Sequence, residues 1–405
     1  MPPPLIRRVV IRNYKSIAAC TVDLQQLMFV VGPNGAGKSN FLDAFRFVAD
    51  ALRTSLDHAL RDRGTIKEVR RRSGGHPNSF ALRFEFVLPG GQAGQYEFQV
   101  AARAAGGYEV QSESCQIDSA EALAPPHYYR VEAGKRVASS VMTLPAVLPD
   151  RLLLVAASGL PEFRPVFDAL SRMEIYNLNP REIGAMQRPD PGDILRRDGS
   201  NAASVLQQLP LPIRERINAH IADIVPGVSD ATPRTLGSQE TIEFRQAVRG
   251  QEHPWRFLAG SMSDGTLRAF GVLLAIFQAG AARPGVPAPL LIGIEEPELA
   301  LHPAALSVLL AALHEGARHC QMLVTSHSPD LLDNPDIPPE ALLAADADAG
   351  MTQIGLIDAA GREMLRKRLF TPGELLRQNQ LARDRHAESD PVGGAAGDLF
   401  GNGKG

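Results

Sequence analysis

One stretch of eight residues limits what this chain can fold into more than any other. It consists of Gly32, Pro33, Asn34, Gly35, Ala36, Gly37, Lys38 and Ser39. It fits the pattern G-x-x-x-x-G-K-[ST] of a phosphate-binding loop. Residues 27–31 before it are apolar, and residues 41–48 after it carry apolar side chains at helical spacing. Since strand, glycine loop and helix are the order that the motif requires, the sequence predicts a P-loop here.

The loop also indicates its ligand. Its glycines let successive backbone N–H groups turn inward at a helix N-terminus, where they attract anions. We expect Lys38 to reach the β- and γ-phosphates of ATP and the Ser39 hydroxyl to coordinate Mg²⁺. A glycine turn can match the pattern by chance, but the flanking segments argue against that interpretation. The prediction is an ATP and Mg²⁺ site at residues 32–39.

A second motif places two carboxylates at the end of an apolar run. Residues 290–294 are apolar or glycine, and Glu295 and Glu296 follow them. This is the pattern of a Walker-B strand, which presents acid at the carboxyl edge of a sheet. Glu295 would then belong to the Mg²⁺ shell, and Glu296 would orient or deprotonate the attacking water. Taken alone, the stretch is equally typical of a strand that ends in a solvated turn.

Two weaker motifs follow the same logic. An apolar strand leads to His327, whose neutral imidazole can donate a hydrogen bond to a γ-phosphate oxygen. Ser263 and Gly265 open a predicted helix, and a helix N-terminus is a second anion site. A structural histidine and an ordinary helix cap are the alternatives. Only the order of the motifs along the chain favours the functional interpretation.

The pattern of the rest predicts a mixed α/β fold. Period-two alternation predicts strands at residues 5–13, 20–24, 80–88, 96–102 and 108–117. The last three are separated by glycine-rich turns and predict an antiparallel meander. Residues 152–209 are helix-prone but interrupted by prolines, so we expect a helical insert. After residue 258, strands and helices alternate, which predicts a parallel sheet covered on both faces.

Composition sets further limits. The chain has 405 residues, 44% of them hydrophobic, which is enough for one or two domains with a large core. Its net charge of −3 means that contact with nucleic acid or a membrane requires a local patch. Three separated cysteines and the lack of any long apolar run or signal-like N-terminus lead us to expect a soluble cytoplasmic protein. Residues 386–405 are expected to form a disordered tail.

As a set, the motifs resemble those of a known group of ATPases. A P-loop, a long insert, S-D-G-T from Ser263, E-E-P-E-L-x-L-H-P from Glu295 and T-S-H-S-P around His327 follow one another. This order resembles the ABC-type ATPase heads of the RecF, SMC and OLD families. It is especially similar to stand-alone bacterial AAA-family ATPases of the RecF/OLD-like group. The resemblance covers about residues 1–375.

The resemblance implies an organisation for the whole chain. It implies a P-loop NTPase fold of the ABC-ATPase type over residues 1–385, divided at about residues 150 and 240. It also implies a homodimer on ATP binding, in which Ser263 and Gly265 contact the γ-phosphate held by the other subunit. Residues 297–303 match the segment that contains the D-loop.

The same resemblance implies roles at the acidic edge. Glu296 matches the catalytic glutamate, and His327 matches the switch histidine. Glu295 stands where the family usually has aspartate, which predicts a slower or slightly shifted site. The signature sequence S-D-G-T also departs from the S-G-G-Q of transporters, and the sequence does not assign the Q-loop glutamine.

Features that are missing from the sequence narrow the subfamily. Residues 40–260 show no sustained heptads, so no SMC-like coiled coil is expected. The segment after His327 is shorter than an ordinary domain, and it lacks the Glu-Gly-x-x-Asp signature of a TOPRIM nuclease domain. Asp346 and Asp348 precede Gly350 and predict a polar hairpin turn rather than a metal site. Any nuclease activity should therefore come from a partner.

Three functions remain open at this stage. The first is an ATP-gated dimeric switch in DNA repair or in defence against foreign DNA, acting on DNA or on a separately encoded nuclease or toxin. The basic run from Arg61 to Arg72 could grip DNA phosphates, although a solvated loop explains it equally well. The second is a nucleotide-binding scaffold with little hydrolysis, for which Glu295 is the local hint. The third is a transporter ATPase subunit, which the signature and the long insert disfavour.

Overall fold

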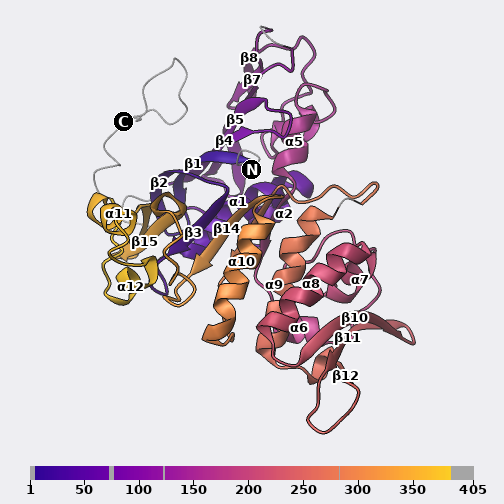
Figure 1. The fold of residues 1–405 in the computed structure, drawn as a ribbon. Helices are drawn as coiled ribbons and strands as arrows, with labels where there is room; N and C mark the ends of the chain where they lie inside the picture. The colour runs from indigo at the N-terminus through magenta and orange to yellow at the C-terminus, as the bar shows by residue number, and fades with distance from the viewer. Residues whose placement is uncertain (1–4, 73–76, 122–123, 282, 385–405) are drawn as a thin grey trace.

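The computed structural model describes residues 5–72, 77–121, 124–281 and 283–384 (Figure 1). Within these ranges, its centre is a parallel sheet of five strands in the order β9, β13, β14, β3 and β15. Their bounds are Met173–Tyr176, Leu291–Glu295, Gln321–Ser326, Leu27–Val31 and Leu342–Asp348. All five residues of β3 are buried. A continuous apolar run is what a parallel strand covered on both faces requires.

An antiparallel arm extends the same sheet. It runs in the order β8, β7, β6, β5, β4, β1 and β2, and the hairpin of β15 and β16 joins it to the parallel core. Its bounds are Ile6–Tyr14 (β1), Ile17–Asp23 (β2), Ser79–Val87 (β4), Ala93–Ala102 (β5), Tyr108–Ile117 (β6), His127–Glu132 (β7) and Lys135–Ser139 (β8); β16 spans Met351–Leu356. The predicted N-terminal strands and meander are confirmed. Asp346 and Asp348 end β15 in this hairpin, as the polar-turn interpretation predicted.

Helices cover both faces of the parallel core, and the side chains of β3 point alternately to one face and to the other. Met28 and Val30 belong to one hydrophobic cluster, and Phe29 and Val31 belong to the other. The first cluster is formed with α1 (Lys38–Arg53), α4 (Leu153–Ala157) and α5 (Arg164–Leu170). The second is formed with α7 (Ala202–Gln208), α8 (Leu211–Ile224), α9 (Asp264–Phe277) and α10 (Leu306–Gly316). The predicted α/β fold class with a mixed sheet is therefore confirmed.

The remaining elements are short. They are α2 (Leu56–Arg61), α3 (Ile66–Val69), α6 (Pro180–Gly184), α11 (Ala359–Arg366) and α12 (Pro372–Arg377), with 3₁₀ turns at Ala259–Ser261, Gln278–Gly280, Pro303–Ala305 and Pro339–Ala341. A separate antiparallel sheet contains β10 (Val228–Leu236), β11 (Gln239–Gln246) and β12 (Trp255–Leu258). It packs with α7 and α8 in a lobe at the opposite end of the molecule from the β7–β8 tip of the arm (Figure 1).

One part of the helical-insert prediction is wrong. Residues 173–176 form β9, the edge strand beside β13, rather than part of a helix. Four residues, of which Glu174 is charged, are too few to show a period, and tertiary pairing decides their conformation. The predicted tail at 386–405 lies outside the described residues. None of the helices within them is both long and apolar enough to cross a lipid bilayer.

Candidate functional site

The P-loop connects β3 to α1 and requires its glycines. Gly32 and Gly37 have φ values of 154° and 91°, and Gly37 caps α1. A Cβ on Gly32 would lie 2.1 Å from the carbonyl oxygen of Ala345, and one on Gly37 would lie 2.0 Å from Oγ1 of Thr352. Both neighbours belong to the β15–β16 hairpin. The C-terminal hairpin thus presses against the loop, a contact that no local sequence signal predicted.

Lys38 lies inside this loop and is 5% exposed. Its Nζ donates hydrogen bonds to the carbonyl oxygens of Gly32 (2.8 Å) and Pro33 (3.0 Å). Burial lowers the pKa of Lys38, while the charges of Glu296 and Glu298 act in the opposite direction. The ammonium is therefore poorly hydrated and held by two neutral acceptors, which a phosphate oxygen would outcompete.

A pocket of about 210 Å³ opens at the loop. Its lining consists of Asn34, Gly35, Gly37, Lys38, Ser39, Asn40 and Glu296. The predicted phosphate-binding residues and the predicted catalytic carboxylate therefore share one cavity. A positive-φ glycine cradle with an ammonium and a hydroxyl on its wall suits a phosphate chain. Hydroxyl and carboxylate oxygens are also the donors that Mg²⁺ prefers, and Ser39 and Glu296 supply them here, whereas Glu295, the predicted metal ligand, is not in the lining.

Glu296 is fixed by the neighbouring strand. Parallel pairing places Glu295 beside Thr325, and the N–H of Glu296 donates to the Thr325 carbonyl (3.0 Å) and Oγ1 (3.2 Å). Glu296 has a φ of 45°, a left-handed conformation that few glutamates adopt. Its Oε1 lies 3.2 Å from Nδ1 of His327. The structure thus brings together Glu296, His327 and the P-loop pocket.

Glu295 points to a different partner. Its Oε1 accepts a hydrogen bond of 3.1 Å from Nη2 of Arg197, which lies in the loop before α7. Nη2 of Arg268, on α9, donates to the main-chain carbonyls of Glu295 (3.1 Å) and Glu296 (3.2 Å). Neither arginine was predicted as a site residue: Arg197 is 98 positions from Glu295, and Arg268 follows the S-D-G-T motif without belonging to it.

Two further residues at this edge were also missed. Glu298 is 6% exposed, and its Oε1 accepts from Oγ of Ser326 (2.6 Å) and from the N–H of His327 (3.3 Å). Burial raises the pKa of Glu298, although these donors oppose the shift. Asn177 follows β9, whose pairing with β13 brings its amide to the same sheet edge. The repeated glutamate of the motif was the only local signal for Glu298.

Ser263 and Gly265 lie at the start of α9. Oγ of Ser263 accepts the N–H of Thr266 at 3.2 Å, so it is the N-cap. A Cβ on Gly265 would lie 2.3 Å from the carbonyl oxygen of Ala300, in the segment after the acidic motif. Neither residue lines the P-loop pocket. Within one subunit, the structure does not bring these two predicted site residues to the nucleotide cradle.

Much of the positive charge in the run from Arg61 to Arg72 is compensated locally. The Arg63 side chain is 4% exposed and donates to Asp43 and Asp50 on α1. Arg61 pairs with Asp57, and Arg72 pairs with Glu68. Since Arg63 is internal, the run is not the continuous basic surface that its sequence suggests.

Comparisons with known proteins agree with this geometry. Residues 27–333 match the family model described as "AAA domain, putative AbiEii toxin, Type IV TA system". A search of curated proteins gave no match. Among solved structures, an SMC head bound to the C-terminal winged-helix domain of ScpA superposes with a TM-score of 0.53 at 14% identity, covering 87% of this chain and 97% of that one.

Two further SMC heads are similar at lower scores. The head of Thermotoga maritima gives a TM-score of 0.45 at 14% identity, covering 88% of this chain and 100% of its own. The Pyrococcus furiosus head with an extended coiled coil gives 0.49 at 12% identity, with coverages of 90% and 99%. Because the family model spans most of the chain, the protein belongs to this AAA-domain family and has the fold of an SMC/RecF-like ABC-type ATPase head.

Proposed function

We propose that the protein is a dimeric, ATP-hydrolysing switch that acts on DNA or on a separately encoded effector, in DNA repair or in defence against foreign DNA. The observation that supports it best is the shared cavity of Lys38, Ser39 and Glu296, with His327 beside Glu296. Membership of an AAA-domain family carries nucleotide binding and hydrolysis in general. The dimer and the pathway are our inference.

The residues support a simple sequence of events. Lys38 exchanges its two carbonyl acceptors for phosphate oxygens, a charge-assisted contact that fixes the nucleotide. Glu296 accepts a proton from the attacking water, and His327 steadies the Glu296 carboxylate through the 3.2 Å contact. Ser39 and Glu295 would hold Mg²⁺, which neutralises charge on the phosphates. Arg197 holds Oε1 of Glu295 and would compete with Mg²⁺ for that oxygen, which gives the slower or shifted site a physical cause.

A second subunit would complete the site. Ser263 and Gly265 open α9, whose N-terminal N–H groups and dipole suit an anion, yet they lie off the pocket of their own chain. We propose that they contact the γ-phosphate bound by a partner copy. A separately encoded effector is a further proposed partner, by analogy with the SMC head that binds a domain of ScpA.

Substitution of Glu296 with glutamine tests hydrolysis and the dimer together. The amide cannot take a proton, so Glu296→Gln should bind ATP, hydrolyse it at least roughly a hundred times more slowly, and accumulate as a dimer. ATP binding is measured with a fluorescent analogue, and mass by light scattering. Lys38→Ala serves as the control that loses ATP affinity. Undiminished turnover in Glu296→Gln would refute the catalytic assignment.

Slow hydrolysis by the wild-type protein would favour the scaffold instead. The Arg197–Glu295 contact is the observation that supports this second candidate, because it occupies a predicted Mg²⁺ ligand. A scaffold would bind ATP tightly without turnover at any DNA concentration. A switch would show turnover that DNA or the effector changes.

A further inference from the structure

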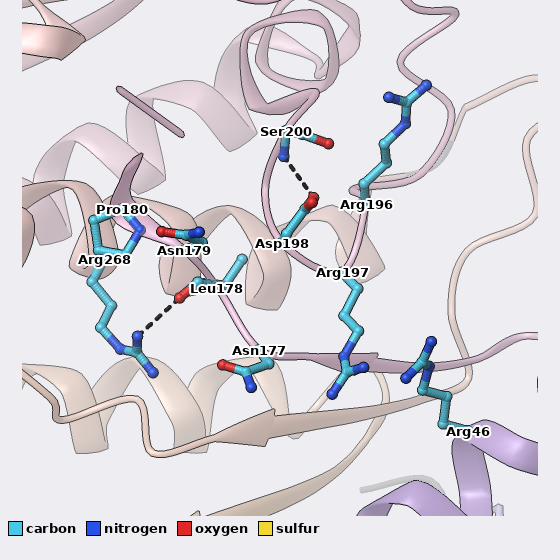
Figure 2. A pocket seen from close by; sticks show the side chains of 10 residues that line it. All are labelled: Arg46, Asn177, Leu178, Asn179, Pro180, Arg196, Arg197, Asp198, Ser200 and Arg268. Carbon is cyan, nitrogen blue, oxygen red and sulfur yellow. Dashed lines mark hydrogen bonds between the residues drawn. The ribbon is translucent and has the colours of Figure 1, made fainter. Parts of the chain in front are cut away.

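A hollow of about 850 Å³ lies beside the acidic edge of the sheet (Figure 2). Four segments form its wall: α1, the residues after β9, the loop before α7, and α9. Arg46, Arg196, Arg197 and Arg268 line it, against one carboxylate, Asp198. Oδ1 of Asp198 accepts the N–H of Ser200 at 3.0 Å and is thus already engaged. Within the lining the arginines outnumber the carboxylates, although Arg46, Arg196 and Arg197 also contact Asp50, Asp190 and Glu295 outside it.

The hollow continues into a second one of about 440 Å³. The two share Arg196 and Ser200, and the second adds Arg188 and Glu182. Together they form a groove lined by five arginines and two carboxylates. We call it the arginine groove. Several guanidinium groups in one groove suit a chain with a charge on every unit better than they suit a single small anion.

Two arginines in the groove, Arg46 and Arg197, repel each other, and the carboxylates beside Arg46 are shared with another arginine. The guanidinium groups of Arg46 and Arg197 lie near each other at one end of the hollow (Figure 2). Burial lowers the pKa of Arg46, and the charge of Arg197 lowers it further. Asp50, which lies 3.3 Å from Arg46, is also held by Arg63 at 3.0 Å. A phosphate between Arg46 and Arg197 would therefore relieve repulsion and gain charge-assisted hydrogen bonds.

We propose that the arginine groove binds the phosphodiester backbone of a nucleic acid, without reading its sequence, and that Arg197 couples this binding to the nucleotide site. Only the coupling through Arg197 rests on the proposed ATPase function; binding of nucleic acid in the groove does not. The proposal also moves the nucleic-acid contact away from the run between Arg61 and Arg72, which is interrupted by the buried Arg63.

The coupling follows from one shared side chain. Arg197 lines the groove and also donates to Oε1 of Glu295, the proposed Mg²⁺ ligand. A backbone phosphate competes for Arg197 and releases Glu295, while Mg²⁺ at Glu295 releases Arg197 for a phosphate. Each ligand therefore favours the other, by a factor that is the same in both directions. Typical couplings of this kind are roughly tenfold.

Binding of labelled oligonucleotides to the nucleotide-free protein tests the site. Fluorescence anisotropy with random-sequence single-stranded and duplex DNA, over a salt series, gives affinity and the number of phosphates engaged. The double variant Arg46→Gln/Arg197→Gln should bind at least roughly tenfold more weakly, with a salt slope smaller by about 1 to 2. The charge-preserving variant Arg46→Lys/Arg197→Lys should retain most of the affinity.

Controls place the contact in the groove. Arg164→Gln, at a side chain 60% exposed on α5, should bind DNA as the wild type does. If the double variant unfolds, Arg196→Gln, also at a side chain 60% exposed, should show a smaller loss in the same direction. The proposal fails if the groove variants bind DNA normally, or if Arg61→Gln/Arg72→Gln alone removes binding. It also fails if tripolyphosphate binds in the groove and DNA does not compete with it.

A magnesium titration tests the coupling separately. With a fluorescent ATP analogue, Arg197→Gln should need less Mg²⁺ than the wild type, since Glu295 is already free. Oligonucleotide should lower the Mg²⁺ requirement of the wild type but not of the variant. If oligonucleotide binds the groove but leaves the requirement unchanged, the coupling is wrong. Absence of ATP turnover in the wild type, with groove binding intact, would contradict the proposed ATPase function alone.

Discussion

Replacing Arg63 with alanine should destabilise the protein by about 3–5 kcal/mol, the usual result of breaking a buried ion pair. The Arg63 side chain is 4% exposed, so solvent does not screen it. Its Nε lies 3.0 Å from both carboxylate oxygens of Asp43, its Nη2 lies 3.0 Å from Asp50, and its Nη1 donates to the Ala59 carbonyl at 2.9 Å. Alanine would remove all four of these contacts, leaving Asp43 with Lys15 and Tyr14 and leaving Asp50 with Arg46.

The pKa of Asp43 gives an independent magnitude. Burial would raise this pKa, but Arg63 and then Lys15 outweigh burial and lower it from 3.8 to about 2. A shift of this size is equivalent to about 2 kcal/mol of native-state stabilisation. Loss of the contacts to Asp50 and Ala59 adds to it. Because the folded pKa is depressed, this stability is present above pH 3.8 and is lost as the pH falls toward 2.

Chemical unfolding at neutral pH measures the effect. Arg61→Ala is the matched control, since Arg61 lies two residues away but its side chain is 74% exposed and pairs with Asp57. It should change the unfolding free energy by less than about 1 kcal/mol. Equal losses for the two variants would refute the internal role of Arg63. The role of Arg63 would also be refuted if Asp43→Asn were less stable than the wild type by the same free energy of unfolding at pH 4 and at pH 2.

Three further predictions follow from single contacts. Gly265→Ala should lower the free energy of unfolding by about 1–3 kcal/mol and also lower turnover, because its Cβ would lie 2.3 Å from the Ala300 carbonyl oxygen. Gly90→Ala, whose Cβ would lie 3.6 Å from Oε1 of Gln92, should leave turnover unchanged. Glu298→Gln should gain stability relative to the wild type as the pH rises above 4.5, because the raised pKa of Glu298 makes its charged form costly; a gap that stays constant from pH 4 to pH 8 in denaturant melts would contradict this. Ser263→Arg should keep monomeric ATP binding but lose turnover, and mixing it with Lys38→Ala should restore some; loss of binding by Ser263→Arg itself would show that Ser263 acts only as a helix cap.

Local chemistry made the central strands and the P-loop predictable. Gly32 and Gly37 are needed where φ is positive, and an apolar run before a glycine loop is typical of the strand that leads into a P-loop. The acidic motif was likewise readable, since five residues of a buried strand end at Glu295. Such signals lie within a dozen consecutive residues, so no long-range contact has to be known.

Contacts between distant segments were not predictable in this way. Arg197 and Glu295 are 98 positions apart, and no local pattern in either segment predicts their contact. The burial of Arg63 did leave a signal: Asp43 and Asp50 are seven residues apart on one helix and therefore share a face. A basic run next to such a pair is better interpreted as counter-charge than as a DNA surface.

Helix α9 is attached to the sheet edge at Glu295 and Glu296 and to the segment after it, and this limits how the proposed switch can move. Arg268 binds the carbonyls of Glu295 and Glu296, and Gly265 packs against Ala300 beyond them. A shift of the Glu296 backbone must therefore carry the start of α9 with it, or break these contacts. Since Arg268 also lines the arginine groove, the same shift reshapes the groove. In the proposed switch, the nucleotide site, the α9 N-terminus and the groove would therefore move together, and we expect a ligand at one of them to change the other two.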